Sequence, residues 1–280
     1  MRLGISSYTY AWAIGVPEHP PARPMTATGL LDQAARLGVH LVQAADNLPL
    51  DRLPDSQLEA FEHRAADLRV SIEVGTRGIH PDHLRTYLRL AERLRSPILR
   101  VVVDTADHHP AEDEVVETIQ GLLPEFERAG VCLAIENHDR FPAKTLARII
   151  QRMDSPYVGI CLDTVNSFGA VEGPAVVVEV LGPWVVNLHV KDFVVQRASH
   201  KMGFTVEGRP AGRGQLNVPW LLQALRDQIQ GRRGFTSVRV EPNAILELWT
   251  PPEQALADTM AKEEAWAAAS IAYLRQFVPG

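Results

Sequence analysis

Four apolar, strand-like segments each carry one residue that can bind a metal ion near their ends. The segments are VCLAIENH, VGICLDT, VVNLHVKD and AILELW, and the candidate ligands are Glu136, Asp163, His189 and Glu247. Burying a carboxylate costs several kcal/mol unless the group is paired or bound to a cation. Three acids and one histidine at matching places in successive units therefore predict one shared metal ion.

Three carboxylates and one imidazole form a hard, oxygen-rich set of ligands. Such a set favours Mn²⁺, with Mg²⁺ or Co²⁺ as further candidates, over a structural zinc site built from thiolates, although Zn²⁺ stays open. Free coordination positions would bind neighbouring oxygens of a substrate. The ion would then act as a Lewis acid and stabilise an enediolate.

Each candidate ligand also has a simpler interpretation. A lone His189 would be a core histidine, and a lone Asp163 would cap the turn after its strand. Glu241, in VRVEPN, competes with Glu247, but the Pro-Asn pair that follows it is typical of a turn, so Glu247 is preferred. Glu73, in SIEVG, could also line the pocket.

The ligand-bearing segments belong to a regular alternation of strand-like and helix-like stretches. Four further strands are expected in RLGISSYTY, HLVQAAD, RVSIEVG and ILRVVVD. Helices are expected over residues 25–38, 54–69, 81–95, 110–130, 143–153, 175–181, 218–230 and 253–277. The first has Thr26 or Thr28 as N-cap and Gly38 as its end. Pro124 is expected to kink or split the fourth.

Alternating strands and helices imply parallel pairing with right-handed crossovers. Eight such units favour an α/β fold of the (β/α)₈ TIM barrel type, forming a single domain over residues 1–280. An open, doubly wound sheet is the alternative, but it usually has a glycine-rich turn after the first strand, which GISSYTYAW does not provide.

In such a barrel the ligands would lie at the rim, because catalytic groups come from the carboxyl ends of the strands. Strand side chains alternate in direction, so Glu136 shares a face with His138, and His189 with Lys191. Small or apolar residues precede each ligand on the same face. This pattern predicts a packed floor under a reactive mouth.

The composition is that of a globular protein, with 46% hydrophobic and 22% charged residues and a net charge of -6. This balance argues against a surface that coats nucleic acid. Cys132 and Cys161 both lie in apolar runs, so we expect no disulfide framework and a reducing, cytoplasmic location. No apolar run reaches roughly 18 residues, so no membrane span is expected.

The motifs IENH, CLDTVNS and HVKD, followed by the late strand glutamate, resemble the xylose isomerase-like sugar phosphate isomerase/epimerase superfamily. This superfamily includes ketose 3-epimerases and, more distantly, endonuclease IV, and the resemblance covers nearly the whole chain. It implies that Glu136, Asp163, His189 and Glu247 bind one divalent metal. In the epimerase branch the two matching glutamates also move protons, which implies that role for Glu136 and Glu247. A phosphodiesterase of the endonuclease branch would need several zinc ions and more histidines at strand ends.

The segment 192–217 is long for a connection between a strand and a helix, and it is rich in cations. The cationic or titratable residues in it are Arg197, His200, Lys201, Arg209 and Arg213. One interpretation is a mobile lid that completes the site, and the other is a solvated basic loop.

Within that segment, PAGRGQL resembles a glycine-bearing stretch that follows the seventh strand in the superfamily and from which an arginine reaches the substrate. The resemblance implies this role for Arg213. With Lys191 and His138 it would bind a carboxylate or phosphate of the substrate. Tyr10, Trp12 and Trp249 are candidates for the pocket walls.

The leading hypothesis is a metal-dependent isomerase or epimerase of a sugar or sugar derivative, with Glu136 and Glu247 as the acid/base pair. The alternative is a lyase that decarboxylates a 3-oxo sugar acid, because HVKDF…MGF…EG.PAG.G.L resembles a pattern in decarboxylases of branched sugar acids. A third possibility is a binding protein with a vestigial site. The expected partner is a small sugar or sugar acid, with no nucleic acid, no membrane and a possible homo-oligomer, as in relatives.

Overall fold

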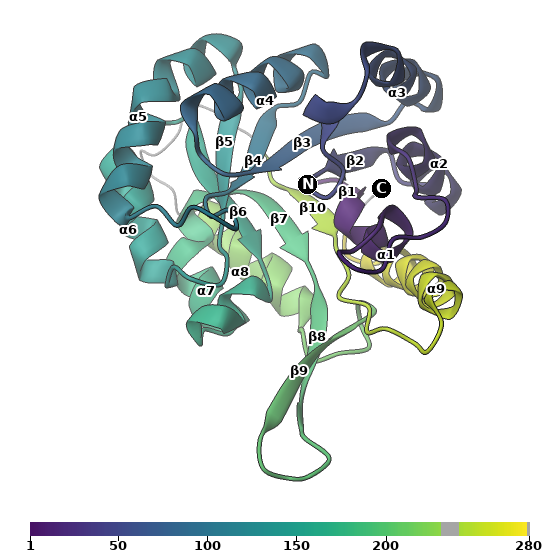
Figure 1. The fold of residues 1–280 in the computed structure, drawn as a ribbon. Helices are drawn as coiled ribbons and strands as arrows, with labels where there is room; N and C mark the ends of the chain where they lie inside the picture. The colour runs from purple at the N-terminus through teal and green to yellow at the C-terminus, as the bar shows by residue number, and fades with distance from the viewer. Residues whose placement is uncertain (231–240, 279–280) are drawn as a thin grey trace.

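The computed structural model describes residues 1–230 and 241–278, and within them eight parallel strands close into a barrel (Figure 1). The strand order around the barrel is β1-β10-β7-β6-β5-β4-β3-β2. The barrel strands are β1 (Leu3–Ser6), β2 (Leu41–Ala44), β3 (Ser71–Arg77), β4 (Ile98–Val102), β5 (Cys132–Glu136), β6 (Val158–Asp163), β7 (Val185–Val190) and β10 (Asn243–Leu246). The predicted (β/α)₈ barrel is therefore confirmed, and the open sheet is excluded.

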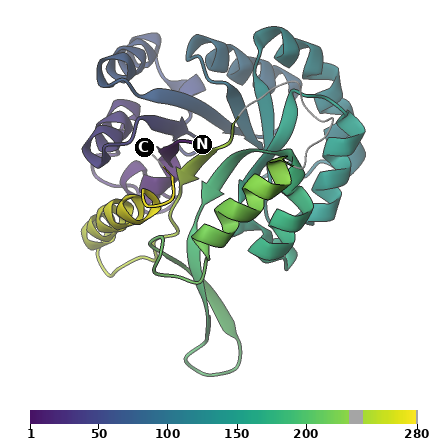
Figure 2. The ribbon, with the colours of Figure 1, turned by 180° about the vertical axis from the view of Figure 1, so that it is seen from behind.

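Helices cover the outside of the barrel and follow the strands in turn (Figures 1 and 2). They are α2 (Ala27–Leu37), α3 (Asp55–Leu68), α4 (Pro81–Arg93), α5 (Glu112–Ala129), α6 (Ala143–Met153), α7 (Pro174–Leu181), α8 (Val218–Gln230) and α9 (Leu256–Leu274). The short helix α1 (Ala11–Ile14) follows β1, and 3₁₀ turns lie at Ser7–Tyr10, Leu50–Arg52, Asn166–Ala170 and Gly182–Trp184. No helix among the described residues has the length and apolar character to cross a membrane.

The ends of α2 are those that the sequence predicted. The side chain of Thr26 accepts a hydrogen bond from the Gly29 N–H at 3.1 Å, and Gly38 ends the helix with a left-handed φ of 64°. Pro124 was expected to kink or split its helix, and the split is excluded because α5 continues through Pro124 as a single helix. The packing of Val115, Ile119 and Phe126 against the barrel outweighs the hydrogen bond that a proline cannot donate.

The register of the strands arranges the interior in layers. Asp163 lies beside His189 across β6 and β7, and Glu136 lies beside Cys161 across β5 and β6. A small apolar cluster closes the interior on the β4–β7 side, and it consists of Ile98, Cys132, Ala134, Cys161 and Val186. The metal-binding candidates therefore lie on a packed floor, as the alternation of side chains predicted.

The prediction of a long loop over residues 192–217 is wrong for most of its length. Strands β8 (Asp192–Arg197) and β9 (Phe204–Arg209) pair antiparallel as a hairpin, which projects away from the barrel (Figures 1 and 2). The alternation in DFVVQR and FTVEGR is the strand signal that accounts for this pairing. A Cβ atom on Gly208 would lie 1.9 Å from the carbonyl oxygen of Trp249, so glycine lets the hairpin base pass close to the barrel mouth.

Candidate metal centre

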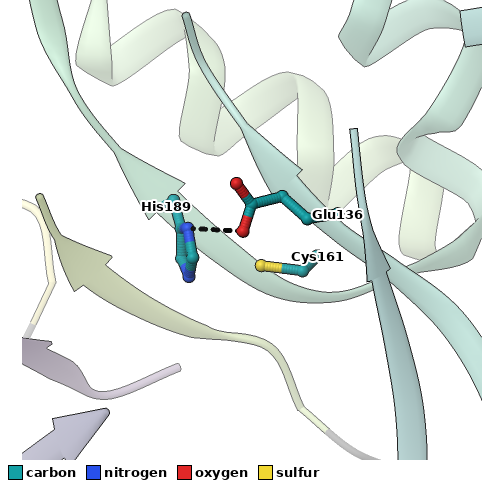
Figure 3. Close-up of side chains that lie close together, drawn as sticks. All are labelled: Glu136, Cys161 and His189. Atoms are coloured by element: carbon teal, nitrogen blue, oxygen red, sulfur yellow. Dashed lines mark ion pairs between the residues drawn. The ribbon is translucent and has the colours of Figure 1, made fainter. Parts of the chain in front are cut away.

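The structure gathers the three candidate carboxylate ligands around His189 at the carboxyl ends of β5, β6, β7 and β10. His189 Nδ1 lies 3.3 Å from Glu136 Oε2, 3.4 Å from Glu247 Oε1 and 3.7 Å from Asp163 Oδ2. Ligand atoms of Asp163, His189 and Glu247 all lie within 4.8 Å of one another. Figure 3 shows Glu136, Cys161 and His189 pointing toward one another from adjacent strands.

The chemistry of these atoms fits a divalent cation. Asp163 Oδ2, His189 Nδ1 and both carboxylate oxygens of Glu247 are buried and have no hydrogen-bond partner among the described residues. Buried polar atoms without partners are rare and costly, and they are expected where an ion completes their coordination. Three carboxylates and one imidazole around one point suit Mn²⁺, Mg²⁺ or Co²⁺.

Cys161 is close enough to be a fifth ligand, but its environment does not favour a thiolate. Burial raises the pKa of its thiol to about 11, so it keeps its proton. The Sγ atom lies 3.4 Å from Asn187 Oδ1, to which it can donate that proton. The centre therefore offers oxygen and nitrogen ligands to a cation, in agreement with the hard set that the sequence indicated.

Lys191 lies directly over the ligands. Its ammonium is 2.7 Å from Asp163 Oδ2 and 2.8 Å from Glu247 Oε2, as an ion-pair contact. Burial opposes ionisation of Asp163, but the charges of Lys191 and His189 outweigh it and lower the pKa of this carboxyl. The pKa of Glu247 is lowered in the same way, with a further contribution from Arg100. Both carboxylates are therefore ready to bind a cation.

The two ligand glutamates differ in their surroundings. Arg100 Nε donates a hydrogen bond to Glu136 Oε2, and Asn166 Nδ2 donates one to Glu136 Oε1 at 2.7 Å. Both oxygens of Glu136 therefore accept hydrogen bonds, whereas Glu247 has an ion-pair contact with Lys191 at Oε2 and no hydrogen bond within the described part of the chain. Of the two, Glu247 is the carboxylate that is freer to exchange a proton with a substrate.

The other half of the mouth carries a cluster that the sequence analysis missed. Asp46 accepts from Arg100 Nη1 at 2.7 Å, from Arg77 Nε at 3.1 Å and from the Tyr8 hydroxyl at 3.0 Å. Burial opposes its ionisation, but the two arginines outweigh that effect and lower the pKa of Asp46. Arg100, inside the apolar run ILRVVVD, carried the same signal as the acids, since a buried charge in a strand needs a partner.

A cavity of about 250 Å³ opens above the centre. Its lining consists of Tyr8, Arg77, Arg100, Glu136, His138, Asp139, Asn166, Lys191, Glu247 and Trp249. The predicted substrate-binding residues Lys191 and His138 thus border it, and so does Trp249. The lining combines the cations Arg77, Arg100 and Lys191, which can donate to an anionic group of a ligand, with the acids Glu136, Asp139 and Glu247.

Other candidates from the sequence lie elsewhere in the described part of the chain. Arg213 is exposed and is not among the residues that line the cavity, because Asp192 Oδ2 accepts the N–H groups of Gly212 and Gly214 at 2.8 and 2.9 Å and holds their turn at the hairpin base. Glu241 is exposed and pairs with the amino group of Met1 at 2.9 Å.

The remaining candidates lie below the centre or beside the cavity. Glu73 is buried in the floor, where it accepts hydrogen bonds from amide side chains. Tyr10 is buried in the core, and Trp12 donates its indole N–H to the Thr250 carbonyl at 2.8 Å. Neither aromatic residue is in the lining of the cavity.

Comparisons with known proteins identify the family of the chain. The model of the xylose isomerase-like TIM barrel family matches residues 31–277. The chain is 33% identical over 276 residues to the 3-oxo-isoapionate decarboxylase of Pectobacterium atrosepticum, covering 98% of this chain and 95% of that protein. It shares its fold with a D-psicose 3-epimerase crystallised in the presence of D-fructose (TM-score 0.71, 16% identity, all of both chains). It also shares its fold with a xylose isomerase-like barrel from Mycobacterium smegmatis in complex with magnesium (TM-score 0.68, 15% identity, 97% of each chain).

Proposed function

The chain belongs to the xylose isomerase-like TIM barrel family, and on that premise we propose that it is a divalent-metal-dependent carboxy-lyase of a 3-oxo sugar acid. The observation that carries the proposal is the asymmetry of the two ligand glutamates beneath the cavity. Both oxygens of Glu136 accept hydrogen bonds, whereas Glu247 is held only by its contacts with ionisable groups, among them Lys191 at 2.8 Å. The similarity to a 3-oxo-isoapionate decarboxylase supports the same reaction class and a substrate of that kind.

Decarboxylation of a 3-oxo acid needs no protein base to remove a proton from carbon. The bond between the carboxylate carbon and C2 breaks, its electron pair moves to C2 and on to the 3-oxo oxygen, and CO₂ leaves. One proton then adds to C2 to give the ketone. A bound divalent cation would supply a Lewis acid for the oxygen that gains this charge.

Residues around the cavity are placed to bind the substrate carboxylate and to transfer the proton to C2. Arg77 and His138 at the cavity wall would hold the substrate carboxylate by charge-assisted hydrogen bonds. Lys191 Nζ lies 2.8 Å from Glu247 Oε2, so this pair can pass the proton that C2 needs. Glu136, whose two oxygens accept hydrogen bonds from Arg100 and Asn166, then transfers no proton and would serve as a metal ligand.

An isomerase or epimerase remains the second candidate, and one specific observation favours it. Glu136 and Glu247 approach His189 Nδ1 from different strands at 3.3 and 3.4 Å, so two glutamates flank the same centre. Epimerisation needs one base to remove a proton and another acid to return it. That reaction would require Glu136 to leave its bond to Arg100 or to take up protons despite it.

The two candidates can be separated in one experiment. Metal-loaded protein is incubated in deuterated water with 3-oxo-isoapionate and, separately, with ketoses, and the products are followed by mass spectrometry. We expect loss of one CO₂ per molecule of the 3-oxo acid, and no loss after removal of metal with a chelator. Deuterium incorporation into a ketose without loss of mass would support the isomerase instead.

A further inference from the structure

Below the metal centre, buried amide and carboxylate side chains form one continuous chain of hydrogen bonds that ends on His189. We propose that Gln43 and Glu73 are positioning residues, which fix the histidine so that its Nδ1 atom faces the metal and its Nε2 atom carries the proton. This inference rests on the proposed function insofar as it needs a metal at the centre. Neither residue contacts the cavity.

The direction of the chain is set at its far end by a backbone group. The Arg2 N–H donates to Asn243 Oδ1 at 3.1 Å, and a backbone N–H can only donate. The oxygen of the Asn243 amide must therefore face Arg2, and its NH₂ group must face Glu73. Asn243 Nδ2 accordingly donates to Glu73 Oε1 at 2.7 Å.

The hydrogen bonds of Glu73 in turn fix the orientation of the Gln43 amide. Its Oε2 atom accepts from Gln43 Nε2 at 3.1 Å and from Asn187 Nδ2 at 2.9 Å. The Gln43 NH₂ group also donates to Asn187 Oδ1 at 3.1 Å. A flipped Gln43 amide would place its carbonyl oxygen against two acceptors, so the NH₂ group stays on this side and the oxygen points away.

The oxygen of Gln43 points at the metal ligand. Gln43 Oε1 lies 2.7 Å from His189 Nε2, so Nε2 carries the hydrogen of this bond. Nδ1 then presents its lone pair toward Glu136, Glu247 and Asp163, where the metal would bind. An outer partner that fixes the tautomer and orientation of a ligating histidine is a general feature of metal sites.

The barrel register explains why these residues meet. Gln43 pairs with Glu73 across β2 and β3, and Asn187 pairs with Asn243 across β7 and β10, so two neighbouring pairs face each other one layer below the ligands. Burial raises the pKa of Glu73, while its three amide donors oppose that effect and stabilise the anion.

The test compares Gln43→Leu and Glu73→Gln with the full-length wild-type protein. Mn²⁺ binding is measured by titration calorimetry, and loss of either positioning residue is expected to weaken it about 10- to 100-fold. Tyr87→Phe is the matched control, because Tyr87 is also buried and hydrogen-bonded, to Asp51, but lies in the outer helix α4 away from this chain of bonds. A second readout is the ¹⁵N NMR spectrum of the histidines in Mg²⁺-loaded protein, where Gln43→Leu should lose the single Nε2–H form of His189.

Each outcome decides the matter. Unchanged Mn²⁺ affinity and an unchanged histidine spectrum in both variants would overturn the positioning role and leave the proposed reaction intact. A loss of affinity in Tyr87→Phe as large as in the two variants would also overturn it. Absence of metal binding by the wild type would overturn the metal-dependent function and the positioning role together. Should Gln43→Leu fail to fold, Glu73→Gln, which keeps the size of the side chain, decides alone.

Discussion

The two halves of the barrel mouth carry different chemistry. The half built on β5, β6, β7 and β10, here called the acceptor half, supplies Glu136, Asp163 and Glu247, which surround His189. The half built on β1 to β4, here called the cationic half, supplies Arg77, Arg100 and Tyr8, which hydrogen-bond to Asp46. The acceptor half has more buried acceptors than donors, whereas the charges of the cationic half are paired.

This difference suits the acceptor half to binding a cation and the cationic half to binding an anionic group. Buried acceptors are costly without donors or cations, and the single ammonium of Lys191 faces the two carboxylates of Asp163 and Glu247, so the acceptor half favours a further cation. In the other half, Asp46 holds the two arginines at fixed positions while leaving both on the cavity wall. A substrate that carries a carboxylate beside a carbonyl would use both halves at once.

The largest effect is expected in the acceptor half. Glu247→Gln removes a ligand charge and the freer carboxylate, so we expect kcat to fall about 10²- to 10⁴-fold. Glu136→Gln should also abolish most turnover, through loss of metal. Circular dichroism should show that both variants remain folded.

Glu241→Gln is the matched control, because Glu241 lies exposed on the chain shortly before the same strand. Its turnover should equal that of the wild type. Full activity of Glu247→Gln, with bound metal, would show that this carboxylate neither binds the ion nor moves a proton.

The second effect concerns stability and the link between the halves. Arg100 is buried and joins Glu136 to Asp46, so Arg100→Met leaves the buried Glu136 without its arginine and Asp46 with Arg77 alone. We expect the free energy of unfolding of the metal-free protein to fall by about 3–5 kcal/mol, measured by denaturant titration. Added Mn²⁺ should restore part of that loss, because it neutralises Glu136.

Arg85→Met serves as the comparison, since Arg85 makes its ion pairs with Asp82 and Glu125 near the protein surface. That variant should leave the unfolding midpoint almost unchanged. Equal losses in the two variants would mean that the halves are not coupled through Arg100.

The acceptor half could be predicted from the sequence because each ligand interrupts an apolar strand. A buried acid in VCLAIENH or AILELW has few explanations, and the alternation of strands and helices brings strand ends together. The cationic half could not, because Arg77, Arg100 and Asp46 come from separate strands and no local pattern tells which charges will pair. For Arg213 the sequence suggested a contact with the substrate, whereas the residue is exposed and does not line the cavity. Its position depends on the turn that Asp192 holds at the hairpin base, which no local sequence pattern predicts.

A third prediction tests which cation recognises the substrate. Arg77→Met removes a charged donor from the cavity wall, and such a bond contributes about 1.5–3 kcal/mol. We therefore expect KM for a 3-oxo sugar acid to rise about 10- to 100-fold, with a smaller change in kcat. Arg213→Met is the matched variant, because the sequence favoured Arg213 and the structure leaves it exposed. Equal rises in KM would mean that the hairpin base closes over the cavity during turnover.

The smallest expected effect is a change of stability with pH. It concerns the loop-like segment that follows β1, which consists of the 3₁₀ turn with Tyr8 and the short helix α1. Glu263 of α9 accepts the N–H groups of Trp12 and Ala13 at 3.0 and 3.1 Å and so holds this loop to the barrel. Burial raises the pKa of Glu263 to about 7, from an ordinary value of 4.5. Between these values the folded protein binds more protons than the unfolded chain does.

The contribution of this raised pKa is therefore fully present below the unfolded value and is lost as the pH rises through about 7. The free energy of unfolding should fall by at most about 1 kcal/mol per pH unit in this range. Glu263→Gln cannot ionise, so its stability relative to the wild type should improve as the pH rises, as measured by denaturant titration at several pH values. Parallel pH profiles for the two proteins would show that Glu263 ionises in the folded state as it does in the unfolded chain. The loop would then be held by its hydrogen bonds alone.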